Sequence, residues 1–155
     1  MTYSSQSIGN YLLQKAAASG GLDSLQTLKL TYISDGFVLG ILDHSLIEDD
    51  IEAWKYGPVI RKLYAGLPAG ASRVTTVGTG EAANLDGDTR RVVDDVFEKY
   101  GTKSGIYLSS LTHRVGTPWD LTWKRYGKNA IIPRELIQAH YKKILAGADI
   151  GASGL

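Results

Sequence analysis

The stretch DSLQTLKLTYISDGF, residues 23–37, decides the fold of this chain. Its apolar residues form two stripes at helical spacing, Leu25, Leu28 and Tyr32 in one and Leu30, Ile33 and Phe37 in the other. A helix with two apolar stripes is buried on most of its sides, so we expect it at the centre of the core. Asp23 stands three residues before Gln26, a spacing that predicts a capping box at the start of the helix.

Helical periodicity recurs on both sides of this segment. Further apolar series at helical spacing lie around residues 8–16, 58–67, 92–100, 107–111, 119–126 and 133–145. Pro58 is predicted at a first helical position, where its missing N–H costs nothing, and Ser104 and Thr117 are predicted caps. Residues 39–57 break the period and indicate either a short strand pair or an irregular loop. Residues 69–89, rich in Gly, Ala, Thr and Ser, indicate a surface loop.

These elements predict a mainly α fold, a compact single-domain bundle of six to seven short helices with at most a minor β-hairpin. The length of 155 residues suits one domain with one core. We expect the helical domain to cover residues 1–147. The small and polar residues 148–155 are expected to form a flexible C-terminal tail.

The composition indicates a cytoplasmic protein without membrane or metal chemistry. Hydrophobic residues make up 43% of the chain, and there is no cysteine, which excludes a disulfide framework and a thiolate metal site. The first fifteen residues lack the basic start and apolar run of a signal peptide. No stretch approaches the ~20 apolar residues that span a bilayer.

The charges are unevenly distributed along the chain. Residues 1–98 carry eight Lys and Arg against thirteen Asp and Glu, a net charge of −5, whereas residues 99–143 carry nine against two, a net charge of +7. A candidate basic face is formed by Lys124, Arg125, Lys128, Arg134, Lys142 and Lys143. A solvated surface explains this segment, and a face for an acidic protein or a nucleic acid is the alternative.

The sequence contains no pattern typical of a catalytic or metal-binding site. His44, His113 and His140 are far apart and lack the spacing of a zinc site. No serine has a convincing base, and no phosphate-binding loop is present. The acidic run at 48–52 lacks the glycine and terminal glutamate of a calcium loop. We therefore expect no cofactor, no metal and no catalytic residue, and not an enzyme.

Two aromatic segments remain, each with a tryptophan beside a proline. Their candidate site residues are Glu52, Trp54, Tyr56, Gly57, Pro58, His113, Pro118 and Trp119. In the structural interpretation, these large side chains lock loops onto a helical core, and Gly57 before Pro58 provides a tight turn. In the functional interpretation, the two segments share a groove, because Trp and Tyr dominate binding hot spots.

The same segments resemble those of a known family. LKLTYISD (28–35) resembles the second helix of the Panacea (SocA-like) antitoxins, and EAWKYGPV (52–59) resembles the most distinctive stretch of that family. Tyr64, Leu111-Thr112-His113 with Pro118-Trp119, and the closing helix from Ile132 to Tyr141 follow in the expected order. The resemblance runs from about residue 8 to residue 145.

The resemblance implies the antitoxin of a two-gene toxin–antitoxin system, of the kind found on phages and mobile elements. Its expected partner is a cognate toxin neutralised by direct contact, and some branches of the family resemble adaptors that deliver the toxin to an ATP-dependent protease. Residues 69–89 and the tail match no part of the family pattern.

Two alternatives stay open beside the antitoxin hypothesis. The first is a phage or mobile-element protein that uses the same fold to inhibit a host protein or to bind nucleic acid, although no helix suited to reading a groove of nucleic acid can be singled out. The second is an enzyme site around Trp54, Tyr56, His113 and Trp119, which predicts a concave polar pocket with a perturbed titratable group.

Overall fold

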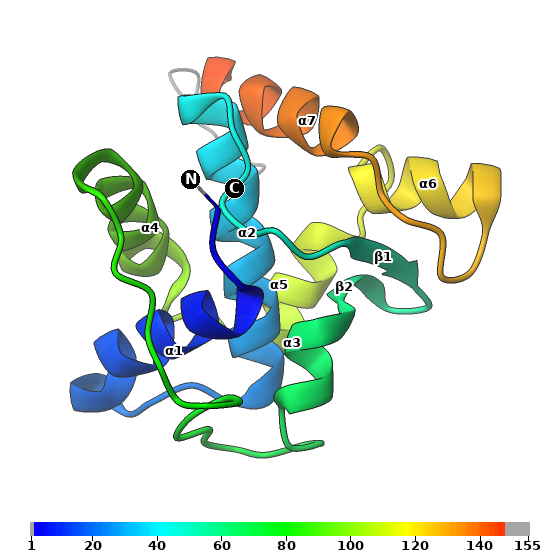
Figure 1. Cartoon of the computed structure of the whole chain (residues 1–155). Helices are drawn as coiled ribbons and strands as arrows, with labels where there is room; N and C mark the ends of the chain where they lie inside the picture. The colour runs from blue at the N-terminus through cyan, green and yellow to red at the C-terminus, as the bar shows by residue number, and fades with distance from the viewer. Residues whose placement is uncertain (1, 148–155) are drawn as a thin grey trace.

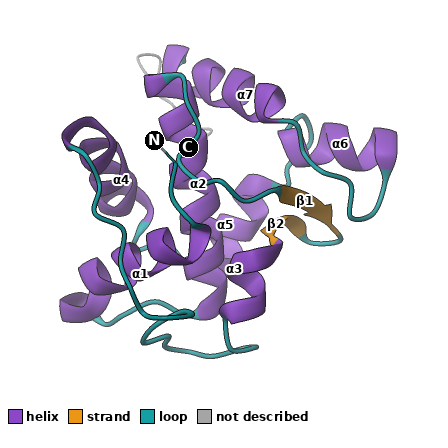
Figure 2. Ribbon diagram, viewed as in Figure 1, coloured by secondary structure: helices purple, strands orange, loops and turns teal. Residues whose placement is uncertain are grey.

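The computed structural model describes residues 2–147 and shows a mainly α fold (Figures 1 and 2). The described elements are α1 (Ser5–Ala16), a 3-10 turn (Ala17–Ser19), α2 (Ser24–Leu42), β1 (Ile51–Trp54), β2 (Gly57–Ile60), α3 (Arg61–Gly66), α4 (Gly87–Tyr100), α5 (Gly105–Thr112), α6 (Pro118–Tyr126) and α7 (Arg134–Ala146). The predicted fold class is confirmed. No helix among these residues is long and apolar enough to cross a membrane. The predicted tail, residues 148–155, lies outside the described residues.

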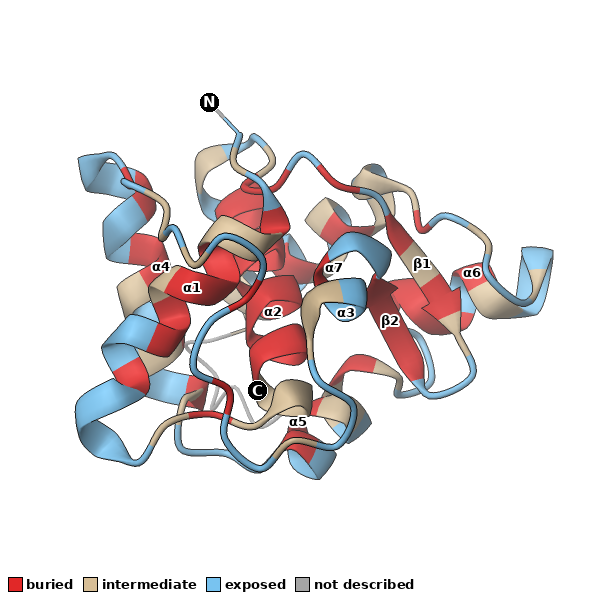
Figure 3. Cartoon of the chain, turned by 60° about the horizontal axis from the view of Figure 1, so that its bottom comes forward, coloured by how far each residue is buried: buried red, intermediate tan, exposed pale blue. Residues whose placement is uncertain are grey.

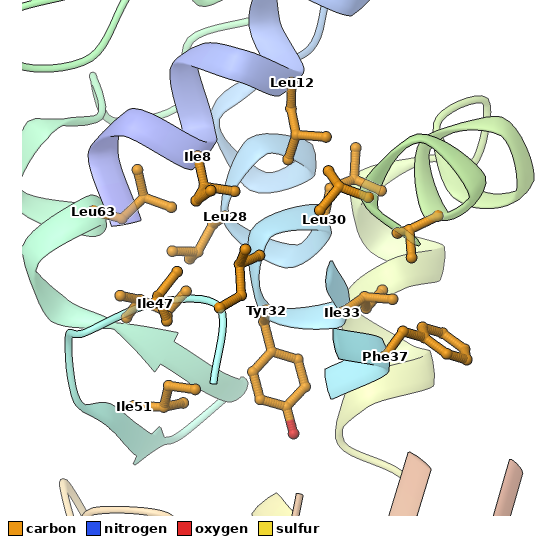
Figure 4. Packing of buried hydrophobic residues seen from close by; sticks show 14 of the residues in the cluster. Ile8, Leu12, Leu28, Leu30, Tyr32, Ile33, Phe37, Ile47, Ile51 and Leu63 are labelled. Carbon is orange, nitrogen blue, oxygen red and sulfur yellow. The ribbon is translucent and has the colours of Figure 1, made fainter. Parts of the chain in front are cut away.

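Helix α2 runs through the centre of the molecule, as its two apolar stripes predicted. It contacts α1, α4, α5, α7 and β2, and every residue from Thr27 to Gly40 is buried (Figure 3). Ile8, Leu12 and Leu63 pack around its first half (Figure 4). The capping box is also present, because the Asp23 carboxylate accepts from the Gln26 amide while the Gln26 side chain accepts from the Asp23 amide. The burial of nearly the whole helix makes α2 the core element.

Helix α7 packs closely on α2 because α2 has a glycine at the crossing point. A Cβ atom added at Gly36 would lie 2.3 Å from Cε2 of Tyr141. The Tyr141 ring contacts Phe37 edge-on, with 4.8 Å between ring centroids, and is 4% exposed. The ring therefore occupies the space that any side chain at position 36 would need.

A buried ion pair connects α2 to α7 and to the loop before the hairpin. Asp35, which is fully buried, accepts from the backbone amides of Leu46 and Ile47 and from Nη1 of Arg134 at 2.7 Å. Arg134 also donates to the Asp49 carbonyl. Burial raises the pKa of Asp35, while Arg134 and the two amides oppose that shift. Arg134, which the sequence placed in the candidate basic face, is partly buried here, and its guanidinium pairs with this carboxylate.

The segment at 39–57 contains the strand pair that the sequence left open. Strands β1 and β2 are antiparallel, with Ala53 opposite Pro58. Pro58 does not start a helix as predicted, since it lies within β2 and α3 begins three residues later. The backbone of Ala53 bonds to Asn129 and Ala130 on its other side, so Ala53 and Pro58 form a non-hydrogen-bonded pair. A missing N–H costs nothing at such a position.

The predicted loop 69–89 ends at residue 86, because α4 begins at Gly87, and the loop is anchored to the core. Val74, Val77 and Leu85 are buried. Asn10 on α1 donates to the Val77 carbonyl at 2.8 Å and accepts from the Val77 amide at 2.8 Å. The prediction of a surface loop was therefore incomplete. The buried Asn10 side chain satisfies the backbone N–H and C=O of Val77, which have no strand partner.

We expect Gly36→Ala to lower the free energy of unfolding by about 1–3 kcal/mol, because the new methyl group must displace the Tyr141 ring. Gly87→Ala is the matched control, since a Cβ at this first residue of α4 meets nothing within 4 Å. Urea unfolding of the two variants checks this expectation. Equal stability of the two variants would contradict the close packing of α2 and α7.

We expect Asp35→Asn to cost about 3 kcal/mol, because Arg134 then keeps its charge in a largely buried position without a carboxylate. The double variant Asp35→Asn with Arg134→Met should recover part of that loss, since both charges are then removed. A thermal or urea double-mutant cycle measures this coupling. Strictly additive effects would show that the ion pair contributes nothing to the fold.

Candidate functional site

The two tryptophan–proline segments meet, although 65 residues separate them in the sequence. The indole N–H of Trp119 donates to the carbonyl of Trp54 at 2.6 Å. Trp119 is 8% exposed, stacks on Trp123 with 5.4 Å between ring centroids, and meets the ring of His113 edge-on at 5.5 Å. Pro118 is the first residue of α6, as predicted, and brings Trp119 to the hairpin. The two segments therefore form one cluster.

The hairpin turn presents its aromatic side chains at the surface. Lys55 and Tyr56 form the turn, and Tyr56 is 71% exposed. The Tyr56 carbonyl accepts a hydrogen bond from the Ser109 hydroxyl at 3.0 Å, which ties the turn to α5. Gly57 has φ +124°, a backbone conformation that residues with side chains rarely adopt. This confirms the predicted turn that only glycine tolerates easily.

Glu52 and Arg61 hold the Trp54 ring from the side of the hairpin. Glu52 accepts from the Trp54 indole at 3.1 Å and from two nitrogens of Arg61, each at 2.8 Å. The hydrogen bond from Arg61 holds the pKa of the Glu52 carboxyl below its usual range. The half-buried Trp54 ring lies under the Arg61 guanidinium and edge-on to Tyr64, with 5.0 Å between ring centroids. Trp54 is thereby fixed in one orientation.

A groove of about 510 Å³ opens between this hairpin, α2, α3 and α5. Its lining is mostly apolar and consists of Leu25, Leu28, Lys29, Trp54, Lys55, Tyr56, Val59, Tyr64, Ile106, Ser109, Ser110 and His113. Three large hydrophobic side chains in this lining are unusually exposed, with 71% for Tyr56, 49% for Tyr64 and 79% for Ile106. Clustered apolar exposure of this kind makes the groove a candidate interaction site.

Lys29 is a residue of this groove that the sequence did not single out. Its side chain comes from the first half of α2, is 2% exposed, and donates to the Pro58 carbonyl at 2.9 Å. Among residues 2–147 it has no other hydrogen bond and no ion pair. Burial lowers the pKa of its amine to about 7. One feature of the sequence could have revealed this buried amine. Lys29 is a charged residue between Leu28 and Leu30, in a helix that was predicted to be buried on most sides.

The basic residues predicted as a face do not line the groove, and several are already paired. Lys124 forms an ion pair with Asp120 at 3.2 Å, and Lys142 with Asp43 at 2.7 Å. Arg125 lies over the Tyr126 ring, and Lys128 and Lys143 are exposed. Arg134 is paired with Asp35, so three of the six basic residues of this face have a carboxylate partner. The opposed charge regions of the sequence are therefore partly neutralised in the fold.

The enzyme hypothesis required a concave polar pocket with a perturbed titratable group. The groove is concave and contains one such group, Lys29, but its lining is mostly apolar. His113 lies at its edge, with Nδ1 bonded to the Ser109 carbonyl. In the part of the chain that the structure describes, three or more His, Cys, Asp or Glu side chains never gather into a possible metal site. The arrangement offers apolar contact and one buried amine.

The fold and this groove define a class of protein, a small helical domain that offers a concave surface with aromatic walls. Residues 28–120 match the model of the family described as antitoxin SocA-like, Panacea domain, and the chain belongs to this family. Antitoxin SocA of Caulobacter vibrioides (strain NA1000 / CB15N) is 27% identical over 136 residues, which cover 80% of this chain and 72% of that protein. No solved structure matches the chain.

We expect Lys29→Met to be at least as stable as the wild-type protein at pH 6. Between pH 7 and pH 10.5 the unfolded chain holds the Lys29 proton and the folded chain does not, so wild-type stability rises with pH, by at most about 1.4 kcal/mol per unit. The stability advantage of Lys29→Met should therefore shrink as the pH rises from 7 to 9.5. Urea unfolding of both proteins across this range measures it, and a constant difference would contradict a neutral buried amine.

Proposed function

We propose that this protein is a non-enzymatic antitoxin that binds its cognate toxin directly in the cytoplasm, with the aromatic groove as the contact surface. The main observation in support is that residues 52–59, which lie within the part of the chain that matches the family, form one wall of a groove with clustered apolar exposure. Tyr and Trp at such positions supply large contact areas at low entropic cost.

The groove can form the centre of an interface of ordinary size. A stable interface buries roughly 800 Å² on each partner, and its energy concentrates in a few desolvated aromatic contacts near the centre. Tyr56 and Ile106 both line the groove and come from different elements, the hairpin turn and α5. A toxin segment that fills the groove would contact both.

The candidate basic face supports a nucleic-acid partner less well than the groove supports a protein partner. Lys124 and Lys142 have carboxylate partners, and Arg134 is bound to buried Asp35. Contacts with phosphate groups require cationic side chains that are free to make them. Each Lys or Arg side chain that is already paired with a carboxylate reduces the electrostatic free energy gained on binding nucleic acid. We therefore place the function at the groove, with a protein toxin as partner.

We expect co-expression of this protein to restore growth of cells that express the cognate toxin, here taken as the product of the neighbouring gene, and to retain that toxin on co-purification. Tyr56→Ala with Ile106→Ala should weaken toxin binding at least tenfold, about 1.4 kcal/mol or more, in a calorimetric titration. Both side chains are exposed, so the melting temperature should stay unchanged.

Tyr126→Ala is the matched control, because Tyr126 is 65% exposed, lies under Arg125 as Tyr56 lies under Lys55, and does not line the groove. Equal weakening by both variants would move the contact surface away from the groove, and no toxin binding at all would remove the antitoxin proposal. The toxin half-life in cells separates simple occlusion from delivery to an ATP-dependent protease, since only delivery shortens it.

A further inference from the structure

The ammonium group of Lys29 has more bonding capacity than the fold uses. A charged lysine has three N–H donors, and the described structure engages one of them, at the Pro58 carbonyl. No Asp or Glu lines the groove, whose other titratable groups are Lys55 and Tyr56 of the hairpin, Tyr64 of α3 and His113 of α5. The groove thus combines apolar walls with amine chemistry and no internal carboxylate.

The surroundings of Lys29 keep its amine in place. A Cβ at Gly57 would lie 2.9 Å from Nζ of Lys29 and 3.6 Å from Cβ of His113, so only glycine leaves room for the amine beneath the turn. Burial opposes its charged form, and a carboxylate brought into contact would restore that form. An amine of this kind adds little to the fold and gains most from an anionic partner.

We propose that Lys29 is the anchor for an acidic side chain, Asp or Glu, which the toxin inserts into the groove beside an apolar residue. This inference rests on the proposed antitoxin function and adds the chemistry of the contacting segment. The apolar neighbour packs against Leu28 and Tyr64, while the carboxylate accepts from the free N–H groups of Lys29. A chain terminus is a poorer occupant, because free carboxylates of chain ends are captured by clusters of backbone N–H groups.

Toxin affinity measured by calorimetry at pH 6.5 tests the proposal with wild-type protein, Lys29→Met and Lys128→Met. Lys128 is the matched control, an exposed lysine that does not line the groove. Lys29→Met should weaken binding at least tenfold while its melting temperature does not fall, and Lys128→Met should bind within about threefold of wild type. Unchanged affinity of Lys29→Met would overturn the proposal and leave the antitoxin function standing.

A second arm works from the toxin, so that the result does not depend on how Lys29→Met folds. Each Asp and Glu of the toxin is changed to Asn or Gln, and one of these changes should reproduce the tenfold loss with wild-type antitoxin and cause no further loss with Lys29→Met. If the affinity instead falls when the C-terminal residue of the toxin is removed, an acidic side chain is not the occupant, and the proposal is overturned. A wild-type protein that binds no toxin would overturn the proposed function itself.

The pH dependence gives an independent readout. The anchor requires the charged amine, so affinity for the toxin should fall as the pH rises from 6.5 to 8.5, by up to tenfold per unit above pH 7. His113 also faces the groove, so the same titration is run on His113→Gln. A fall that persists in His113→Gln and disappears in Lys29→Met supports the proposal, and a fall that persists in Lys29→Met contradicts it.

Discussion

The buried carboxylate of Asp35 holds three separate segments of the chain at one point. Asp35 belongs to α2. Its carboxylate accepts hydrogen bonds from the backbone amides of Leu46 and Ile47, in the loop before the hairpin, and pairs with Arg134 at the start of α7. A carboxylate in a core is stable only when its charge and lone pairs are satisfied, so these segments cannot separate without leaving it unpaired. The position of the hairpin, and therefore of the groove, follows from this requirement.

The aromatic segments have a buried part and an exposed part, which explains why the sequence supported two interpretations of them. Trp119, Pro118 and Pro58 are buried and connect α6 to the hairpin through the bond between Trp119 and the Trp54 carbonyl. Tyr56 stands on the same turn and faces solvent. The buried part gives the exposed part a fixed geometry, which lowers the entropy lost when a partner binds.

Local signals in the sequence predicted most of the helices, because caps and apolar periodicity act over a few residues. The capping box at Asp23 and the caps at Ser104 and Thr117 are all present. Pro58 was assigned to a helix because proline suits a first helical position, whereas its observed place in a strand depends on pairing with Ala53 of β1. The Asp35–Arg134 pair spans 99 residues, and without homologous sequences no local pattern connects its two members. The buried amine in α2 was visible only as a charge in an apolar helix.

The hairpin has neighbours on both sides. Residues 129–132 bond along the outer side of β1, and on the outer side of β2 Pro58 has no N–H while its carbonyl already accepts from Lys29. Addition of a partner strand to a sheet edge through backbone hydrogen bonds is a common mode of association that tolerates many sequences. These edges of the hairpin are already occupied, so a partner strand cannot extend this sheet in that way. Recognition at the proposed contact surface would therefore depend on side chains, which substitution can change while the backbone stays the same.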